Sequence, residues 1–112
     1  MWDQRGKRNH RSPRFGYGRV LSRSDIDAAL QSPAPYKTLG YHPGDADTGI
    51  GAHGTHVADI AAGSTRKDGG GMAPQASLAF VHLASHPLSG LANLGDSVRL
   101  LEAIKFLDEV AG

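Results

Sequence analysis

The feature that most constrains this chain is the run G-A-H-G-T-H-V-A-D-I-A-A-G at residues 51–63. Gly51 and Gly54 allow the backbone to turn tightly, and Thr55 can satisfy free amides where a helix starts. From Val57 onward the side chains are small or aliphatic, as a helix packed closely in a core requires. The run therefore predicts a tight turn that leads into a closely packed helix bearing two histidines.

Those two residues, His53 and His56, lie three apart, so a helix would place them on one face. Metal sites use that spacing, but the H-E-x-x-H pattern is absent and neither a cysteine nor a clear third ligand accompanies them. A glycine-rich loop before a helix can also bind phosphate, yet the run matches neither G-x-x-x-x-G-K-[ST] nor G-x-G-x-x-G. From the residues alone, a glycine-flanked helix with two structural histidines is the default interpretation, and no metal or cofactor is expected.

Two further elements are predicted downstream. Residues 71–83 read G-M-A-P-Q-A-S-L-A-F-V-H-L, and the apolar stretch 78–83 predicts a strand buried on both faces of a parallel sheet. Apolar side chains then recur at helical spacing as far as residue 110, with Asp96 or Ser97 as the N-cap. The apolar positions of this predicted helix include Val98, Leu101, Ile104 and Leu107.

Upstream, the chain reads W-D-Q at residues 2–4 and Y-G-R-V-L-S-R-S-D-I-D-A-A-L at residues 17–30. Ser22 or Ser24 is expected to cap a short helix, which Pro33 stops. The apolar residues of that helix are Ile26, Ala29 and Leu30.

Together these motifs resemble the subtilisin-like serine proteases, or subtilases. Residues 51–63 are similar to the block around the catalytic histidine of that family, G-H-G-T-H-V-A-G-I-x-A-G, and residues 71–78 resemble its G-[VM]-A-P-x-A-x-L. Residues 2–4 and 17–30 resemble the W-D-Q and Y-G-x-x-[YF]-[ST]-R-x-x-I-x-x-A-L patterns of one subgroup. The resemblance implies an α/β fold with a parallel sheet and flanking helices. It also implies that His53 is the general base.

The chemistry of the family needs more than this histidine. A serine hydroxyl is a weak nucleophile and requires an imidazole to take its proton, and a carboxylate must orient that imidazole. The chain contains D-T-G at residues 47–49, but only five residues separate Asp47 from His53 and no apolar strand precedes it. We therefore reject Asp47 as the triad acid. The serine motif G-T-S-[MA]-[AS] has no match either, so the chain alone is expected to be inactive.

These observations predict one incomplete α/β domain rather than a self-sufficient enzyme. We interpret residues 1–112 as a fragment of a subtilisin-like peptidase domain, with a partial parallel sheet and flanking helices. Residues 1–44 would be a basic arm and subgroup insertion, and residues 45–112 the histidine block, the strand and the following helix. The partners implied are a peptide or protein substrate in the complete parent, together with the remaining segments of the peptidase domain. The alternative is a non-catalytic, subtilase-derived binding module.

Three smaller points belong to the resemblance. Asp59 stands where the family usually has glycine, which puts a charge on a helix that is expected to pack tightly. Either Asp59 lies at a solvent-facing edge or this branch of the family has drifted. Residues 86–95 resemble the segment with which subtilases line part of their substrate groove, although the family's glycine pattern is not clearly reproduced between Leu88 and Leu94. Calcium sites cannot be placed from the loop carboxylates Asp45, Asp47 and Asp68.

Charge is distributed unevenly along the chain. Residues 1–23 hold seven of the twelve Lys and Arg and only one acid, Asp3, a balance of +6 against −5 in the rest. A basic arm can bind nucleic acid, and Phe15 and Tyr17 could stack on bases. We interpret the arm instead as a solvated surface loop within an insertion.

Composition adds limits. The chain has no cysteine, so no disulfide framework is expected and the redox compartment stays open, as does the location of the parent. Neither a signal peptide nor an apolar run long enough for a membrane span is present. With 112 residues, 15 of them glycine, and few regular elements, the isolated chain is predicted to be marginally stable or to depend on partner segments.

Overall fold

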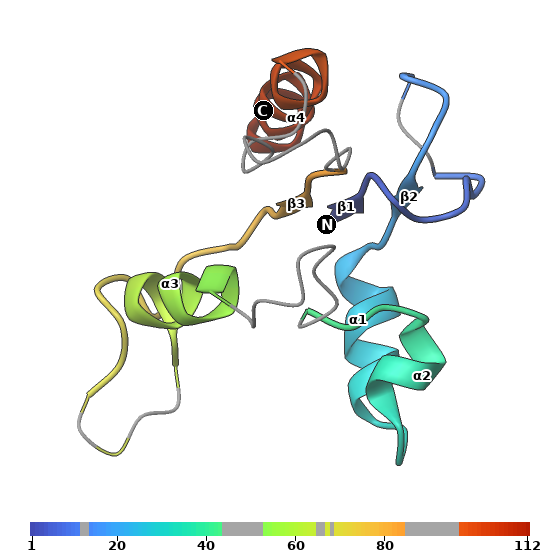
Figure 1. Cartoon of the computed structure of the whole chain (residues 1–112). Coiled ribbons are helices and arrows are strands. Elements are labelled where there is room, and N and C mark those ends of the chain that lie inside the picture. The colour runs from blue at the N-terminus through green and yellow to red at the C-terminus, as the bar shows by residue number, and fades with distance from the viewer. Residues whose placement is uncertain (12–13, 44–52, 65–66, 68, 85–96) are drawn as a thin grey trace. The chain divides into compact units, whose positions relative to one another are not determined.

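The structure, a computed structural model, describes residues 1–11, 14–43, 53–64, 67, 69–84 and 97–112. The chain divides into two compact units, coloured by residue number in Figure 1. The first, here called the sheet unit, comprises Met1–Leu39 and Ala79–Gly112. The second, the histidine unit, comprises Gly40–Leu78. The regular elements of the described residues are helices and short strands, in agreement with the predicted α/β class.

The sheet unit is built on three strands in the order β2-β1-β3. They are β1 (Trp2–Asp3), β2 (Arg19–Val20) and β3 (Val81–His82). β1 pairs antiparallel with β2 and parallel with β3, so the sheet is mixed, whereas the sequence predicted a parallel sheet. The difference arises from the connection between β1 and β2, whose described residues contain no helix, because a parallel pair needs a longer crossover that is usually helical.

The strand predicted for residues 78–83 is shorter and more exposed than expected. Only β3 is paired, and its two residues are half-buried, whereas Leu78 is 68% exposed and Phe80 41% exposed. The backbone amides of Trp2 and Gln4 donate to the carbonyls of Phe80 and His82 at 2.9 and 3.0 Å. Because β1 is only two residues long, it can pair with no more of the apolar stretch than this.

The core of the sheet unit is centred on Trp2, which is fully buried. Its ring stacks on Phe15 with centroids 5.4 Å apart. It also meets Tyr17 and Phe106 at tilted angles, each with centroids 5.3 Å away. Burying a side chain of this size removes roughly 200 Å² of apolar surface from water, worth about 5 kcal/mol before conformational entropy is subtracted.

Gln4 joins three parts of the sheet unit through hydrogen bonds. Its side-chain amide donates to the carbonyl of Arg99 at 2.9 Å and accepts from the amide of Ala84 at 3.1 Å. Gln4 is 4% exposed, so its polar atoms would carry a desolvation cost if these partners were absent. The W-D-Q segment therefore acts as a structural centre that links β1, the end of β3 and the first turn of the last helix.

The predicted short helix is α1 (Arg23–Leu30), and its N-cap is Ser22. Ser22 and Asp25 form a capping box, in which each side chain satisfies a backbone amide of the other residue. A second helix, α2 (Pro35–Leu39), was not predicted. It starts at a proline, whose fixed φ and missing amide suit the first helical position, and it packs against α1.

The last helix, α4 (Ser97–Ala111), confirms the predicted helical spacing. Its buried residues are Ala103 and Phe106, and the Phe106 ring meets that of Trp2 in β1. The predicted apolar positions Val98, Leu101 and Ile104 lie instead on an exposed face, with exposures of 60, 58 and 54%. Asp96 lies outside the described residues, so the predicted choice between two N-caps is not tested. In the parts of the chain that are described, no helix has both the length and the apolar character needed to cross a membrane.

Candidate functional site

Both histidines of the predicted block lie on α3 (His53–Ala62), the helix of the histidine unit. The predicted helix is therefore present, but it begins two residues before Thr55, which lies inside the first turn rather than at the cap. His53 is the first helical residue. Gly51 and Ala52, which precede it, lie outside the described residues.

One face of α3 carries both imidazoles. Because successive residues turn by about 100° around an α-helix, positions 53, 56, 57 and 60 fall on the same side. His53 and His56 are exposed, and their apolar neighbours Val57 and Ile60 are 51 and 62% exposed. This face, which we call the histidine face, combines two groups that can exchange protons with a branched aliphatic surface.

The prediction that α3 packs closely in a core is wrong for the described residues, because none of its residues is buried. Asp59 is exposed, which agrees with a solvent-facing position for the charge that replaces the usual glycine. Within the described chain, the small side chains of α3 are therefore not enclosed by neighbouring residues.

The C-terminal turn of α3 is closed by the G-M-A-P motif. The amides of Gly71, Met72 and Ala73 donate to the carbonyls of Gly63, Ile60 and Ala61 at 2.7, 3.0 and 2.7 Å. Carbonyls in the last turn of a helix have no partners within the helix, so these bonds satisfy groups that would otherwise need water. The motif predicted only as a family feature thus has a local structural task, which is to cap the helix that carries His53.

The chemical capacity of His53 is that of an accessible imidazole. An imidazole within hydrogen-bond reach of a serine hydroxyl can serve as a general base. Across the described ranges, the structure places no serine hydroxyl and no carboxylate in hydrogen bond with the His53 side chain. Those same ranges contain no cluster of three or more potential metal ligands.

Several predicted positions cannot be located. Asp47, considered and rejected as the triad acid, lies outside the described residues. So do the loop carboxylates Asp45 and Asp68 and the segment 86–95 that resembles part of a substrate groove.

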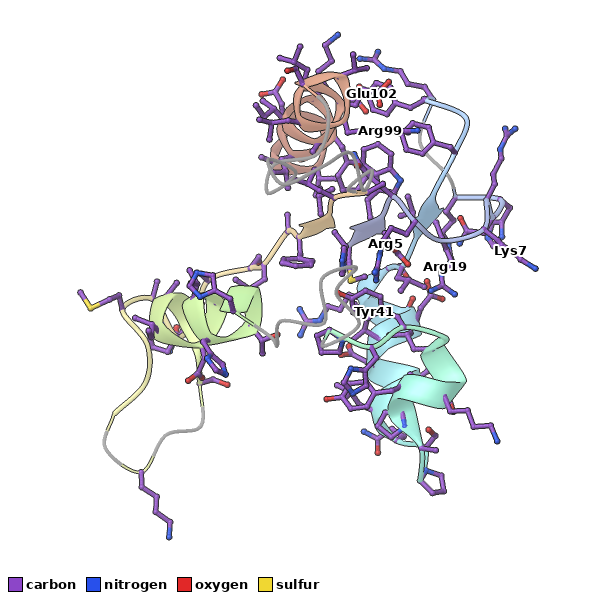
Figure 2. The ribbon with its side chains drawn as sticks, in the orientation of Figure 1. Arg5, Lys7, Arg19, Tyr41, Arg99 and Glu102 are labelled. Atoms are coloured by element: carbon purple, nitrogen blue, oxygen red, sulfur yellow. The ribbon has the colours of Figure 1, made fainter. Side chains whose placement is uncertain are left out.

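Part of the positive charge of the basic arm is paired with acids of the same chain. Arg5 and Arg19 both approach Asp3, with nitrogen to oxygen distances of 3.8 and 3.6 Å, and they lie beside β1 and β2 in Figure 2. Asp3 itself is 4% exposed. Among the described residues, Arg11 also pairs with Asp25, Arg14 with Glu109 and Arg23 with Asp27. Three acids outside the arm therefore offset part of its excess of +6, in which Asp3 is already counted.

The aromatic residues of the arm are already engaged. Phe15 and Tyr17 pack on Trp2, and Arg99 lies 3.7 Å from the centre of the Tyr17 ring. The Tyr17 hydroxyl donates to Glu102, which Figure 2 shows with Arg99 on α4. Burial and this hydrogen bond raise the pKa of Tyr17. Stacking on nucleobases would require both rings to leave the core, which weakens the nucleic-acid interpretation.

Sequence reasoning missed two residues that the structure makes important. The residues around Gln4 form no pattern that predicts its two long-range hydrogen bonds, because the partners lie 80 and 95 residues away. Gly71 was noted only as part of a motif, and its close approach to the end of α3 depends on how residues 63 and 71 meet in space.

Comparison with known proteins adds the last observation. The model of the subtilase family matches residues 22–107, a stretch that contains α1, α2, α3 and β3 and most of α4. Neither a curated protein nor a solved structure gives a significant match. The match spans well over half of the chain and includes both the histidine block and the G-M-A-P motif, which earlier pointed the same way. The chain therefore belongs to the subtilase family.

Proposed function

We propose that this chain is the histidine-bearing segment of a subtilisin-like serine endopeptidase, with His53 as the general base. One observation carries the proposal. His53 begins an ordered helix inside the family-matched region, and its side chain is exposed rather than buried in a core. A histidine kept only for packing would be expected to contact its own unit, whereas a base must be open to a reacting partner.

In this proposal the reaction is hydrolysis of a peptide bond through an acyl-enzyme. His53 removes the proton of the serine hydroxyl as it attacks the scissile carbonyl, and returns that proton to the leaving amine. A carboxylate on the second ring nitrogen holds the required tautomer and stabilises the imidazolium. The reaction needs no cofactor.

The serine and the carboxylate would come from other segments of the peptidase domain. The histidine face supports this, because Val57 and Ile60 form an exposed aliphatic surface around the two imidazoles. A polypeptide that covers it would exclude water from the apolar side chains while bringing a hydroxyl to His53. The 112-residue chain alone should not react with a fluorophosphonate probe. His53-dependent labelling of the purified chain would contradict this expectation.

A chimaera tests the proposal directly. The whole 112-residue chain would replace the matching segment of an active subtilase, and peptide hydrolysis would be measured with His53→Ala and His56→Ala variants. We expect the first substitution to lower kcat by on the order of 10⁴- to 10⁶-fold, a range set by triad removal in subtilisin itself rather than by this chain. His56→Ala is the matched control, since it removes the same ring from the same face and should cost less than about tenfold. Equal losses from both substitutions would contradict the role of His53.

The second candidate is a non-catalytic binding module derived from a subtilase. The exposed apolar face of α4, with Val98, Leu101 and Ile104, favours it because such a face is typical of a surface that meets another protein. In that case a biological effect of the chain would survive His53→Ala but would be lost on Leu101→Asp. The reverse pattern would favour the peptidase.

A further inference from the structure

The G-M-A-P motif fits against α3 with no space to spare at Gly71. A Cβ atom added there would lie 2.6 Å from the amide nitrogen of Ala62 and 2.7 Å from that of Gly63. It would also lie 2.8 Å from the carbonyl carbon of Ala61. All three are backbone atoms, so no side chain can rotate away to make room.

The restriction at Gly71 is steric rather than conformational. Gly71 is not among the glycines with positive φ, so alanine could adopt its backbone angles without strain. Its neighbour Gly70 shows the same crowding more weakly, because its added Cβ would lie 2.8 Å from the carbonyl oxygen of Gly63 and 2.9 Å from Pro74. The two glycines thus form a close seat for the last turn of α3, which we call the glycine seat.

This contact acts at the opposite end of α3 from His53. The helix has ten residues and is therefore about 15 Å long at 1.5 Å per residue. A tilt of about 5° at the glycine seat would move the first residue by about 1 Å. Because an α-helix is held by a continuous series of backbone hydrogen bonds, a tilt at its C-terminal turn also moves its first residue.

We propose that Gly71 is a positioning residue for His53, acting through the capped C-terminal turn of α3. The inference rests on the proposed function, in which His53 must meet a serine supplied by another segment. Reactions of this kind tolerate little error in geometry, because a misplacement of about 1 Å can lower the rate by on the order of 100-fold. Gly71→Ala should therefore impair the chemical step without removing any group that contacts the substrate.

The first experiment examines the seat in the intact 112-residue chain. Amide hydrogen exchange would be followed by NMR for Met72 and Ala73, whose amides donate to the carbonyls of Ile60 and Ala61. Gly71→Ala should accelerate both exchange rates by at least tenfold while the amides inside α3 stay protected. Gly54→Ala is the matched control, because nothing lies within 4 Å of its added Cβ, and it should leave both rates within twofold.

The second experiment examines catalysis in the chimaera that carries the whole chain. Active sites would be counted by fluorophosphonate labelling, so that kcat is expressed per labelled site. We expect Gly71→Ala to lower kcat per site by about 10- to 100-fold with KM changed less than about threefold. A purely structural effect would instead reduce the number of labelled sites and leave kcat per site unchanged. Gln75→Ala, an exposed substitution in the same segment, should leave kcat per site and KM at wild-type values.

The possible outcomes test the positioning role of Gly71 separately from the role of His53 as the general base. Unchanged exchange rates, or an unchanged kcat per site in Gly71→Ala, would overturn the positioning role while leaving His53 as the base. An inactive wild-type chimaera would overturn the proposed function and the positioning role together, whereas the exchange data would still show whether the seat exists. If Gly71→Ala does not fold, Gly70→Ala tests the same seat, with a smaller loss of kcat per site expected and wild-type values counting against it.

Discussion

At the scale of single residues, the burial of Trp2 depends on the glycine at position 18. Gly18 is buried and has a φ of 72°, a backbone conformation that residues with a side chain rarely adopt. A Cβ there would overlap the Trp2 indole nitrogen and would lie 2.8 Å from the carbonyl oxygen of Asp3. The indole in turn donates to the carbonyl of Tyr17 at 3.4 Å. Both the turn and the core therefore require the smallest side chain at this position.

Gly18→Ala should consequently destabilise the sheet unit by about 2–4 kcal/mol, from backbone strain plus displacement of the indole. Gly16→Ala is the matched control, because Gly16 has φ of 79° but nothing within 4 Å of its added Cβ. It should cost only the strain, about 1–2 kcal/mol. Urea unfolding followed by the fluorescence of the single tryptophan measures both variants. Equal losses would show that crowding against Trp2 contributes nothing.

At the scale of elements, α1 is held at its start by a charged capping box. Asp25 accepts from the Ser22 amide at 2.8 Å and the Ser22 hydroxyl at 2.7 Å, and it pairs with Arg11 at 2.5 Å. The pKa of Asp25 is lowered from 3.8 to about 2. The largest cause is the hydrogen bond from the Ser22 backbone amide, followed by the bond from the Ser22 hydroxyl and then the bond from Arg11. The folded state therefore favours the ionised carboxylate, and its stabilising contribution is complete above about pH 4.

That contribution should disappear as the pH falls from about 4 to about 2, because protonation of Asp25 removes an acceptor from the cap. We expect the Ser22 and Asp25 amide resonances to shift toward unfolded positions over this range, and exchange at the first turn of α1 to accelerate. In Asp25→Asn the same titration should be absent at Ser22. A midpoint near the ordinary aspartate pKa in the wild-type chain would contradict the cap.

The helices and the strands differ in how far local signals predict them. α1 and α4 follow from caps and from spacing that neighbouring residues carry, and α3 from a motif. The side of α4 that is buried does not follow. Val98, Leu101 and Ile104 have the expected periodicity, but the buried residues are Ala103 and Phe106, and Phe106 meets the ring of Trp2. Periodicity alone indicates that a helix has an apolar face, whereas the partner decides which face is covered.

At the scale of the whole molecule, the buried apolar side chains of the described residues all belong to the sheet unit. They are Trp2, Leu21, Ala29, Ala103 and Phe106. The histidine unit instead exposes Ile60, Met72 and Leu78 at 62, 90 and 68%. The two units should therefore differ in stability, with the histidine unit the weaker one in isolation.

Replacing residues 40–78 by a flexible linker of about 15 residues should leave the Trp2 core intact. We expect the tryptophan emission to stay at short wavelength and the urea midpoint to lie within about 0.5 M of the full chain. Phe106→Ala in the same shortened chain is the control that should expose Trp2. A red-shifted emission without that substitution would show that the histidine unit supports the core.

The full chain should also unfold over a broad range, as the composition suggested, because much of its apolar surface is uncovered. Scanning calorimetry of the monomer measures this. A single sharp transition with matching calorimetric and van't Hoff enthalpies would contradict marginal stability.

The sequence by itself determined the elements whose causes are local. A serine cap at Ser22 or Ser24, the helical spacing of α4 and the histidine block could all be predicted from short windows of sequence, and the block pointed to the family that the comparison then showed. Only the tertiary structure decided that Trp2 is the centre of the core and that Gln4 links the end of β3 to α4 through hydrogen bonds. It also decided that Gly71 lies against the last turn of α3. The physical reason is sequence distance. β1 pairs with residues 16 and 18 positions away in β2 and 79 positions away in β3, and no pattern within two-residue strands specifies such partners.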